Sequence, residues 1–107
     1  MADGSALGAA ASMRLDRFLW WARLARTRTA AQTLAEDGRL RLDGRLIDRA
    51  HVAVRPGNIL TYVAHGGRVR VLRVEALPRR RGPPAEAQLC YIDLQQAANV
   101  SQQGELD

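Results

Sequence analysis

The sequence predicts an α+β fold: two N-terminal helices packed on a small, mainly antiparallel sheet, followed by a short helix near the C-terminus. Three observations support this prediction. Apolar residues recur every three to four positions between residues 14 and 37, as they do in amphipathic helices. Beyond Gly38 apolar and polar residues alternate, as in half-buried strands. Turn sequences rich in glycine, proline and asparagine then divide the chain into short segments.

The first helix is predicted between Arg14 and Ala25. Its apolar positions follow the i, i+3, i+4, i+7 spacing of a single buried stripe. Asp16 lies near the beginning of this helix, where a negative charge interacts favourably with the helix dipole. Trp21 lies at the edge of the stripe, and we assign it to the core. The stripe consists of Leu15, Phe18, Leu19 and Ala22, and the opposite side carries Arg17, Trp20, Arg23 and Leu24.

The second helix is predicted from Arg28 to about Asp37. Thr27 precedes it and is a favourable N-cap, because its hydroxyl can accept a hydrogen bond from a free N–H group of the first turn. Gly38 can adopt the left-handed conformation that ends a helix. The inward face is small, which allows close packing against the first helix. This face consists of Ala30, Ala31, Leu34 and Ala35.

Three strand regions and a short helix complete the prediction. Residues 39–48 alternate around the Asp-Gly pair at 43–44, a sequence typical of tight hairpin turns. Residues 59–64 and 69–76 form two further strands, each preceded by a turn. Pro84 begins a short helix, because proline fits the first helical position.

The distribution of charge predicts a nucleic-acid partner. All sixteen basic residues are arginine and lie between Arg14 and Arg81, alongside only six acidic residues, so this segment carries a net charge of +10 in a chain of +5. A folded segment this basic is typical of proteins that bind polyanions. A genome-wide preference for arginine codons would explain the absence of lysine, but it would not explain the excess of basic over acidic residues.

Several other classes of protein are excluded or disfavoured by composition. No apolar run approaches the roughly 18 residues of a membrane span. The single cysteine, Cys90, cannot form an internal disulfide or a cysteine zinc site. His51 and His65 lack the neighbours that a metal site needs, and no spacing of serine, cysteine and histidine suggests a nucleophile with its base. We therefore expect a cytosolic protein that holds no metal or cofactor and is not an enzyme.

The arginines concentrate on the exposed side of the first helix, on the break after it and at the start of the second helix. Guanidinium groups donate hydrogen bonds in a planar fork that matches phosphate oxygens. Trp20 lies among them and either stacks on an unpaired base, a contact of about 1–3 kcal/mol, or covers the sheet; we weigh these readings equally. The predicted patch consists of Arg14, Arg17, Trp20, Arg23, Arg26 and Arg28, with Arg39 and Arg41 added by the first strand.

Asp16 is the one acidic residue within the helical part of this patch. No second carboxylate lies at a spacing useful for catalysis, so we assign it a structural role. We expect it to pair with Arg28 or Arg26 and to hold the two helices and their connection in shape.

The order and spacing of these residues resembles the alpha-L RNA-binding motif, also called the S-four domain after a protein of the small ribosomal subunit. The resemblance covers about residues 13–64. It rests on Arg14-Leu15-Asp16-Arg17-Phe18-Leu19-Trp20, Arg26-Thr27-Arg28, Ala31, Leu34, Gly38-Arg39-Leu40-Arg41-Leu42-Asp43-Gly44 and Arg55-Pro56-Gly57-Asn58-Ile59-Leu60.

Within this group the chain is most similar to the bacterial ribosome-associated heat-shock protein fifteen family. The similarity lies in Leu19-Trp20 with Arg26-Thr27-Arg28, and in Arg80-Arg81-Gly82-Pro83 followed by Glu86-Ala87 and Leu89-Cys90-Tyr91. It implies binding to ribosomal RNA of the large subunit and a role in rescuing or recycling subunits that still carry a nascent chain. The RNA contacts that it implies are Arg14, Arg17, Arg23, Arg26, Thr27, Arg28, Gln32, Arg39 and Arg41.

We divide the chain into four segments. Residues 1–12 are expected to be a disordered leader, 13–76 the S-four-type domain with a sheet extension, 77–94 a basic, proline-rich connector with the short helix, and 95–107 a disordered acidic and polar tail. The arginines at 79–81 are either a second phosphate contact, which we favour, or a solvated linker. We expect a monomer.

Three alternatives to ribosomal RNA binding stay open. A DNA-binding helix-turn-helix module would also use a basic second helix, although here that helix offers few base-reading side chains beyond Arg28 and Gln32. A generic RNA-binding accessory protein in RNA modification would carry the same domain. An adaptor between proteins is the third possibility.

Overall fold

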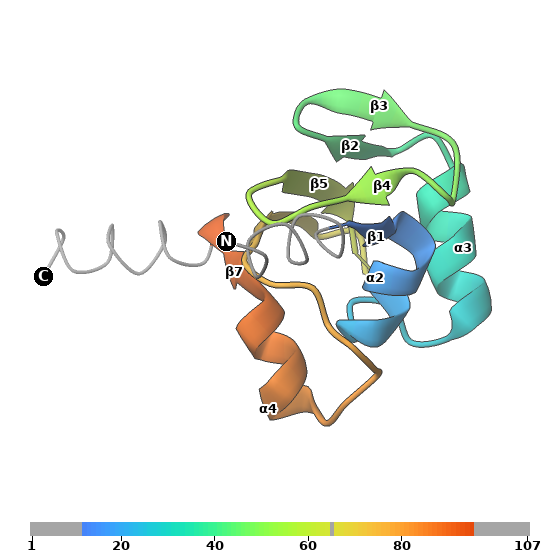
Figure 1. Ribbon diagram of the computed structural model, residues 1–107. Coiled ribbons are helices and arrows are strands. Elements are labelled where there is room, and N and C mark those ends of the chain that lie inside the picture. Colours follow the sequence, from blue (N-terminus) through green and yellow to red (C-terminus); the bar gives the residue numbers. More distant parts are fainter. Residues whose placement is uncertain (1–11, 65, 96–107) are drawn as a thin grey trace, which may run out of the picture.

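The computed structural model describes residues 12–64 and 66–95 and confirms the predicted α+β class (Figure 1). Two short helices, α2 (Leu15–Trp21) and α3 (Arg28–Glu36), pack on one face of an antiparallel sheet. The expected leader at 1–12 and tail at 95–107 fall almost entirely outside the described residues, as does His65.

Helix α2 follows a two-residue strand, β1 (Met13–Arg14), that the sequence analysis did not predict. β1 pairs antiparallel with β4 (Ala53–Val54). The amide of Leu15 then donates to the carbonyl of Val52 at 2.8 Å, and so anchors the beginning of the helix to the loop before β4. The four residues of the predicted stripe in and after α2 are fully buried.

Helix α2 ends four residues earlier than predicted, through a left-handed turn at Arg23. Arg23 has φ +59°, and its amide donates to the Trp20 carbonyl at 3.2 Å. The amide of Leu24 donates to the Leu19 carbonyl at 2.9 Å. This pair of bonds is the Schellman motif, in which the left-handed position usually holds glycine. An arginine there is unusual, since a Cβ disfavours this conformation.

Helix α3 begins as the sequence predicts. The Thr27 hydroxyl accepts a hydrogen bond from the amide of Ala30 at 2.9 Å, so Thr27 is the N-cap. Gly38, at φ +77°, ends the helical region. Ala31 and Ala35 are buried, whereas Ala30, which was predicted to face inward, is exposed.

The main sheet has five antiparallel strands in the order β3-β2-β5-β6-β7. Asp43 and Gly44 both have positive φ, as the predicted tight turn requires. The Asp43 carboxylate also accepts hydrogen bonds from the side chain of Asn58 at 2.6 Å and from the amide of Ile59 at 2.7 Å, which ties the hairpin to β5. The first four strands are β2 (Leu40–Leu42), β3 (Arg45–Ile47), β5 (Ile59–Val63) and β6 (Val69–Val74).

The C-terminal part of the described chain contains a strand that the sequence pattern did not predict. A one-turn helix, α4 (Pro84–Ala87), begins at the predicted proline and continues as a 3-10 turn to Cys90. Residues Tyr91–Asp93, which we had assigned to the end of that helix and its connector, instead form β7 beside β6. Arg70 of β6 pairs with Asp93 at 3.0 Å and fastens this edge. The connector therefore returns the chain to the sheet.

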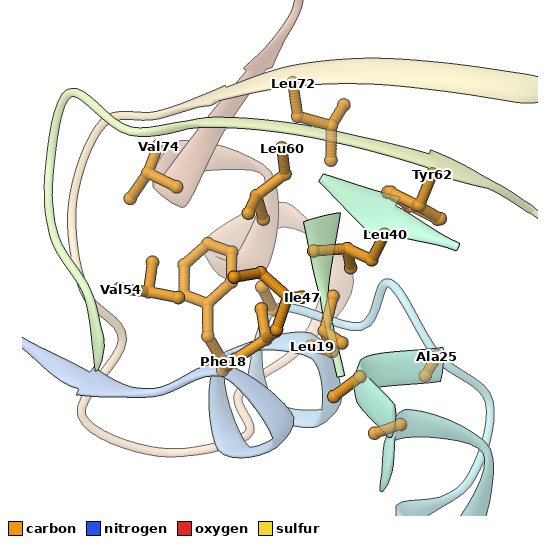
Figure 2. Packing of buried hydrophobic residues seen from close by; sticks show 14 of the residues in the cluster. Phe18, Leu19, Ala25, Leu40, Ile47, Val54, Leu60, Tyr62, Leu72 and Val74 are labelled. Carbon is orange, nitrogen blue, oxygen red and sulfur yellow. The ribbon is translucent and has the colours of Figure 1, made fainter. Parts of the chain in front are cut away.

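The core lies between the helices and the sheet (Figure 2). Phe18 points from α2 toward Leu60 with Val54 of β4 beside it, and Leu19 lies on the side of Leu40. All five side chains are almost completely buried. Because this core fixes α2 through its inner face, the polar outer face of the helix has a defined position relative to α3.

Candidate nucleic-acid interface

A surface hollow of about 310 Å³ lies between the outer faces of α2 and α3. Helical spacing explains its lining, because residues three and four positions apart lie on the same side of a helix. Six of its seven lining residues follow such spacings, along α2 from Arg14 onward and along α3. The seventh is an acidic residue in the first turn of α2. The lining residues are Arg14, Asp16, Arg17, Trp20, Trp21, Arg28 and Gln32. We call this hollow the α2–α3 hollow.

Asp16 orients Arg14, and not Arg28 or Arg26 as we had expected. Its carboxylate accepts two hydrogen bonds from the Arg14 guanidinium, both at 3.0 Å, and a third from the amide of Arg17 at 2.8 Å. The hydrogen bonds and charge of Asp16 raise the pKa of Arg14. Arg14 directly precedes α2, so its side chain reaches the first turn more readily than an arginine of α3 does. Asp16 therefore connects residues at the beginning of α2 to one another and does not connect α2 to α3.

Arg17 and Arg28 are the two arginines of the α2–α3 hollow whose positive charge no neighbouring carboxylate neutralises among the described residues. Both side chains are exposed. The ion pairs found within residues 12–64 and 66–95 involve neither of them. Gln32, one turn after Arg28, adds an amide that can donate or accept. This arrangement can bind a phosphate between two helices while a neutral polar group contacts sugar or base.

Two tryptophans border the hollow, and they differ in their surroundings. Trp20 packs partly against the core, and the guanidinium of Arg81 lies 3.8 Å from its ring centroid. Trp21, which we had assigned to the core, is only half-buried and lies 5.4 Å from the Arg17 guanidinium. The assignment of Trp21 to the core was wrong. Helix α2 turns the side that carries Phe18 and Leu19 toward the sheet, so Trp21 lies at the edge of the buried face.

Arg23 and Arg26 lie in a second hollow, of about 390 Å³, at the end of α2. Arg81 and Tyr91 line the same hollow from the connector and β7. The predicted patch is thus divided between two adjoining hollows. Trp20 lines the first hollow, Arg81 lines the second, and these two side chains stack on each other.

The remaining predicted residues line neither hollow. The Thr27 hydroxyl caps α3, so its contribution is to place Arg28. Arg39 forms an exposed ion pair with Asp37 at 3.5 Å. Arg41 of β2 donates to the carbonyl of Gly44 at 3.2 Å, within its own hairpin.

Trp21 was missing from the predicted binding residues, and Arg81 was predicted only as one of three connector arginines of a second phosphate contact, without its partner Trp20. Trp21 follows Arg17 by four positions, a spacing that places both on one helical face, and this signal was available in the sequence. Arg81 is 61 positions from Trp20, and only folding brings the two together.

The described residues contain neither a metal-binding cluster nor a helix that could cross a membrane. No group of three or more histidine, cysteine, aspartate or glutamate side chains in this part of the chain could hold a metal ion. Among the same residues, every helix is too short or too polar to cross a membrane.

Comparison with known proteins finds a family match in the helical part of the chain and the first strands. Residues 13–60 match the S4 domain family, which confirms the resemblance found in the sequence. Heat shock protein 15 of Escherichia coli K12 and that of Escherichia coli O157:H7 are each 30% identical over 82 residues, covering 77% of this chain and 60% of the relative. The chain thus spans less than two thirds of the length of these relatives.

A solved structure shares the fold. The trimeric structure of heat shock protein 15 from Vibrio cholerae superimposes with a TM-score of 0.74, at 24% sequence identity, over 89% of this chain and 94% of that one. The superimposed share of this chain is larger than residues 13–60, so the shared fold extends beyond the S4 match.

Proposed function

We propose that this chain, whose residues 13–60 form an S4 domain, binds folded RNA through the α2–α3 hollow. S4 domains are RNA-binding domains, and the single observation that supports the location is the pair of uncompensated arginines there, Arg17 and Arg28. A phosphate held between them bridges the two helices. Trp21, beside the stack of Arg81 on Trp20, offers the exposed part of its ring to an unpaired base or a ribose.

The mode of recognition is charge and shape. Helical RNA hides its base edges in a deep, narrow groove, so proteins recognise it mainly through phosphates, 2′-hydroxyls and overall form. The α2–α3 hollow suits this mode, because three of its seven lining residues are arginines and Gln32 is the one neutral amide among them. Arg39 and Arg41 of the first hairpin extend the contact along the RNA backbone.

The RNA that we propose is ribosomal RNA of the large subunit, bound in the bacterial cytoplasm. The support is the similarity to heat shock protein 15 over 77% of this chain. Under this proposal the protein acts during stress on subunits that still carry a nascent chain, and it does so by binding without catalysing a reaction. We propose a monomer as the binding unit, because one chain supplies the whole lining of the α2–α3 hollow.

Crosslinking in cells, followed by sequencing of the bound RNA, tests this proposal. Enrichment of large-subunit ribosomal RNA with the wild type, lost in the double variant Arg17→Gln/Arg28→Gln, is the expected result. The control that removes the same two charges is Arg55→Gln/Arg68→Gln, because both arginines lie in exposed turns and line neither hollow. Uniform recovery of messenger RNA would leave RNA binding in place and remove the ribosomal role.

Duplex DNA is the competitor that distinguishes the alternative helix-turn-helix function. A recognition helix reads base edges in the major groove with several side chains. Here α3 contributes only Arg28 and Gln32 to the hollow. We expect an excess of duplex DNA to leave the complex with ribosomal RNA largely intact, whereas equal competition by DNA would favour the helix-turn-helix function.

A further inference from the structure

The second hollow gathers three arginines from different parts of the chain. Arg23 and Arg26 come from the turn that follows α2, and Arg81 comes from the connector, outside the S4 match at residues 13–60. None of the three takes part in an ion pair within residues 12–64 and 66–95. The neighbouring Arg80, by contrast, is neutralised by Glu86 at 2.8 Å.

Backbone carbonyls hold two of these guanidinium groups in place. Nε of Arg23 donates to the carbonyl of Gly82, and Nε of Arg81 donates to the carbonyl of Trp20 at 3.2 Å. Each arginine therefore reaches across to the other's segment of chain. A bond through Nε leaves the two terminal nitrogens of each guanidinium as donors for a ligand.

The fold keeps these two like charges close to each other. Removal from water and the charge of Arg23 both lower the pKa of Arg81. Arg23 moreover occupies a left-handed position, with φ +59°, where glycine would be unstrained. A non-glycine residue that persists in such a conformation is a reason to look for a function of its side chain. An anion between the two guanidinium groups would relieve their repulsion.

We propose that Arg23, Arg26 and Arg81 form a second phosphate site, and that one RNA strand passes from the α2–α3 hollow over the stacked Trp20 and Arg81 into this site. The inference rests on the proposed RNA-binding function and extends it to the connector. Trp20 lines the α2–α3 hollow, Arg81 lines the second hollow, and the stack of the two side chains connects them. The connector thus takes part in binding, and the S4 domain supplies only part of the interface.

Filter binding to purified large-subunit ribosomal RNA tests the second site. We expect Arg23→Gln and Arg81→Gln each to weaken binding by about five- to eightfold near 0.1 M salt, and to reduce the slope of log affinity against log salt by about 0.7–0.9, as the loss of one phosphate contact does. Arg68→Gln removes the same charge away from both hollows and is expected to change the affinity less than about twofold. Urea denaturation of each variant verifies that it is folded.

The outcomes separate this inference from the function on which it rests. If the wild type binds ribosomal RNA and both Arg23→Gln and Arg81→Gln bind as Arg68→Gln does, the second site is refuted and RNA binding through the α2–α3 hollow stands. If the wild type does not bind RNA at all, the proposed function fails, and the inference fails with it.

Titration with inorganic phosphate examines the second site without RNA. The Nε–Hε resonances of Arg23 and Arg81 can be followed by NMR, and both are expected to shift together and to saturate. The Arg68 resonance serves as the control and is expected to shift only in proportion to ionic strength. Equal behaviour of the three resonances would contradict a built phosphate site.

Discussion

The number of uncompensated arginines at the two hollows determines how steeply RNA binding should depend on salt. Five arginines there lack an ion pair within the described part of the chain: Arg17, Arg23, Arg26, Arg28 and Arg81. Each phosphate that a protein neutralises releases condensed counterions, which contributes about 0.7 to the slope for single strands and about 0.9 for B-form duplexes. Five contacts therefore give a slope of about −3.5 to −4.5 for log affinity against log salt.

The perturbation that tests this count is Arg28→Gln. Arg28 lies in the first turn of α3, is exposed and makes no ion pair within residues 12–64 and 66–95, so glutamine removes its charge with little effect on packing. The slope of log affinity against log salt should become shallower, at about −2.8 to −3.6, and the affinity near 0.1 M salt should fall about five- to eightfold. The assay is filter binding to large-subunit ribosomal RNA from about 0.05 to 0.2 M potassium chloride.

The control is again Arg68→Gln, which lowers the net charge of the chain by the same amount. If net charge alone attracts the RNA, Arg28→Gln and Arg68→Gln will have the same slope and the same affinity, and this result would refute a localised interface. Binding by the wild type that does not change with salt would refute phosphate neutralisation altogether.

Three further predictions concern stability and its relation to binding. Thr27→Ala should lower the free energy of unfolding in urea by about 1 kcal/mol, because α3 loses its N-cap, whereas Thr27→Ser should retain most of it. Arg23→Gly should change that free energy by less than about 1 kcal/mol, because relief of the left-handed strain offsets the lost hydrogen bond to Gly82, while RNA affinity falls; a large loss of stability would contradict this. Burial raises the pKa of Tyr62 above its ordinary value near 10.0, although Arg70 acts to lower it. As pH rises, the unfolded chain therefore loses the phenol proton before the folded chain does. The free energy of unfolding should then fall as pH rises above 10.0 and through the pKa of the folded state. Urea denaturation from about pH 8 to about pH 11 measures this fall, and Tyr62→Phe should make it shallower.

The sequence was sufficient to predict the helices and the hairpin, because their signals are local. The stripe that includes Phe18, the cap at Thr27 and the turn at Asp43 each specify a structure within a few residues, and the structure has all three. Arg17 and Arg28 could be placed on the exposed faces of their helices for the same reason. Both lie on helices whose buried faces were already known from the spacing of apolar residues.

Long-range contacts explain what could not be predicted. β7 pairs with β6 about twenty residues earlier in the chain, and the three residues of Tyr91–Asp93 are too few to show a periodicity. The stack of Arg81 on Trp20 joins positions 61 residues apart, with no local signal at either end. The predicted partner of Asp16 was wrong because a local contact prevails over a more distant one. The arginine two positions earlier reaches Asp16 more easily than the arginines beyond the end of α2.

Crosslinking of the purified chain to large-subunit ribosomal RNA, with mass spectrometric identification of the attached residues, tests the central claim most directly. We expect attachment at Trp20 or Trp21 and on peptides of α2, α3 and the connector, where the two hollows lie. Attachment confined to the exposed face of the sheet, at β3 or at the turn near Arg68, would contradict an interface formed by these arginines.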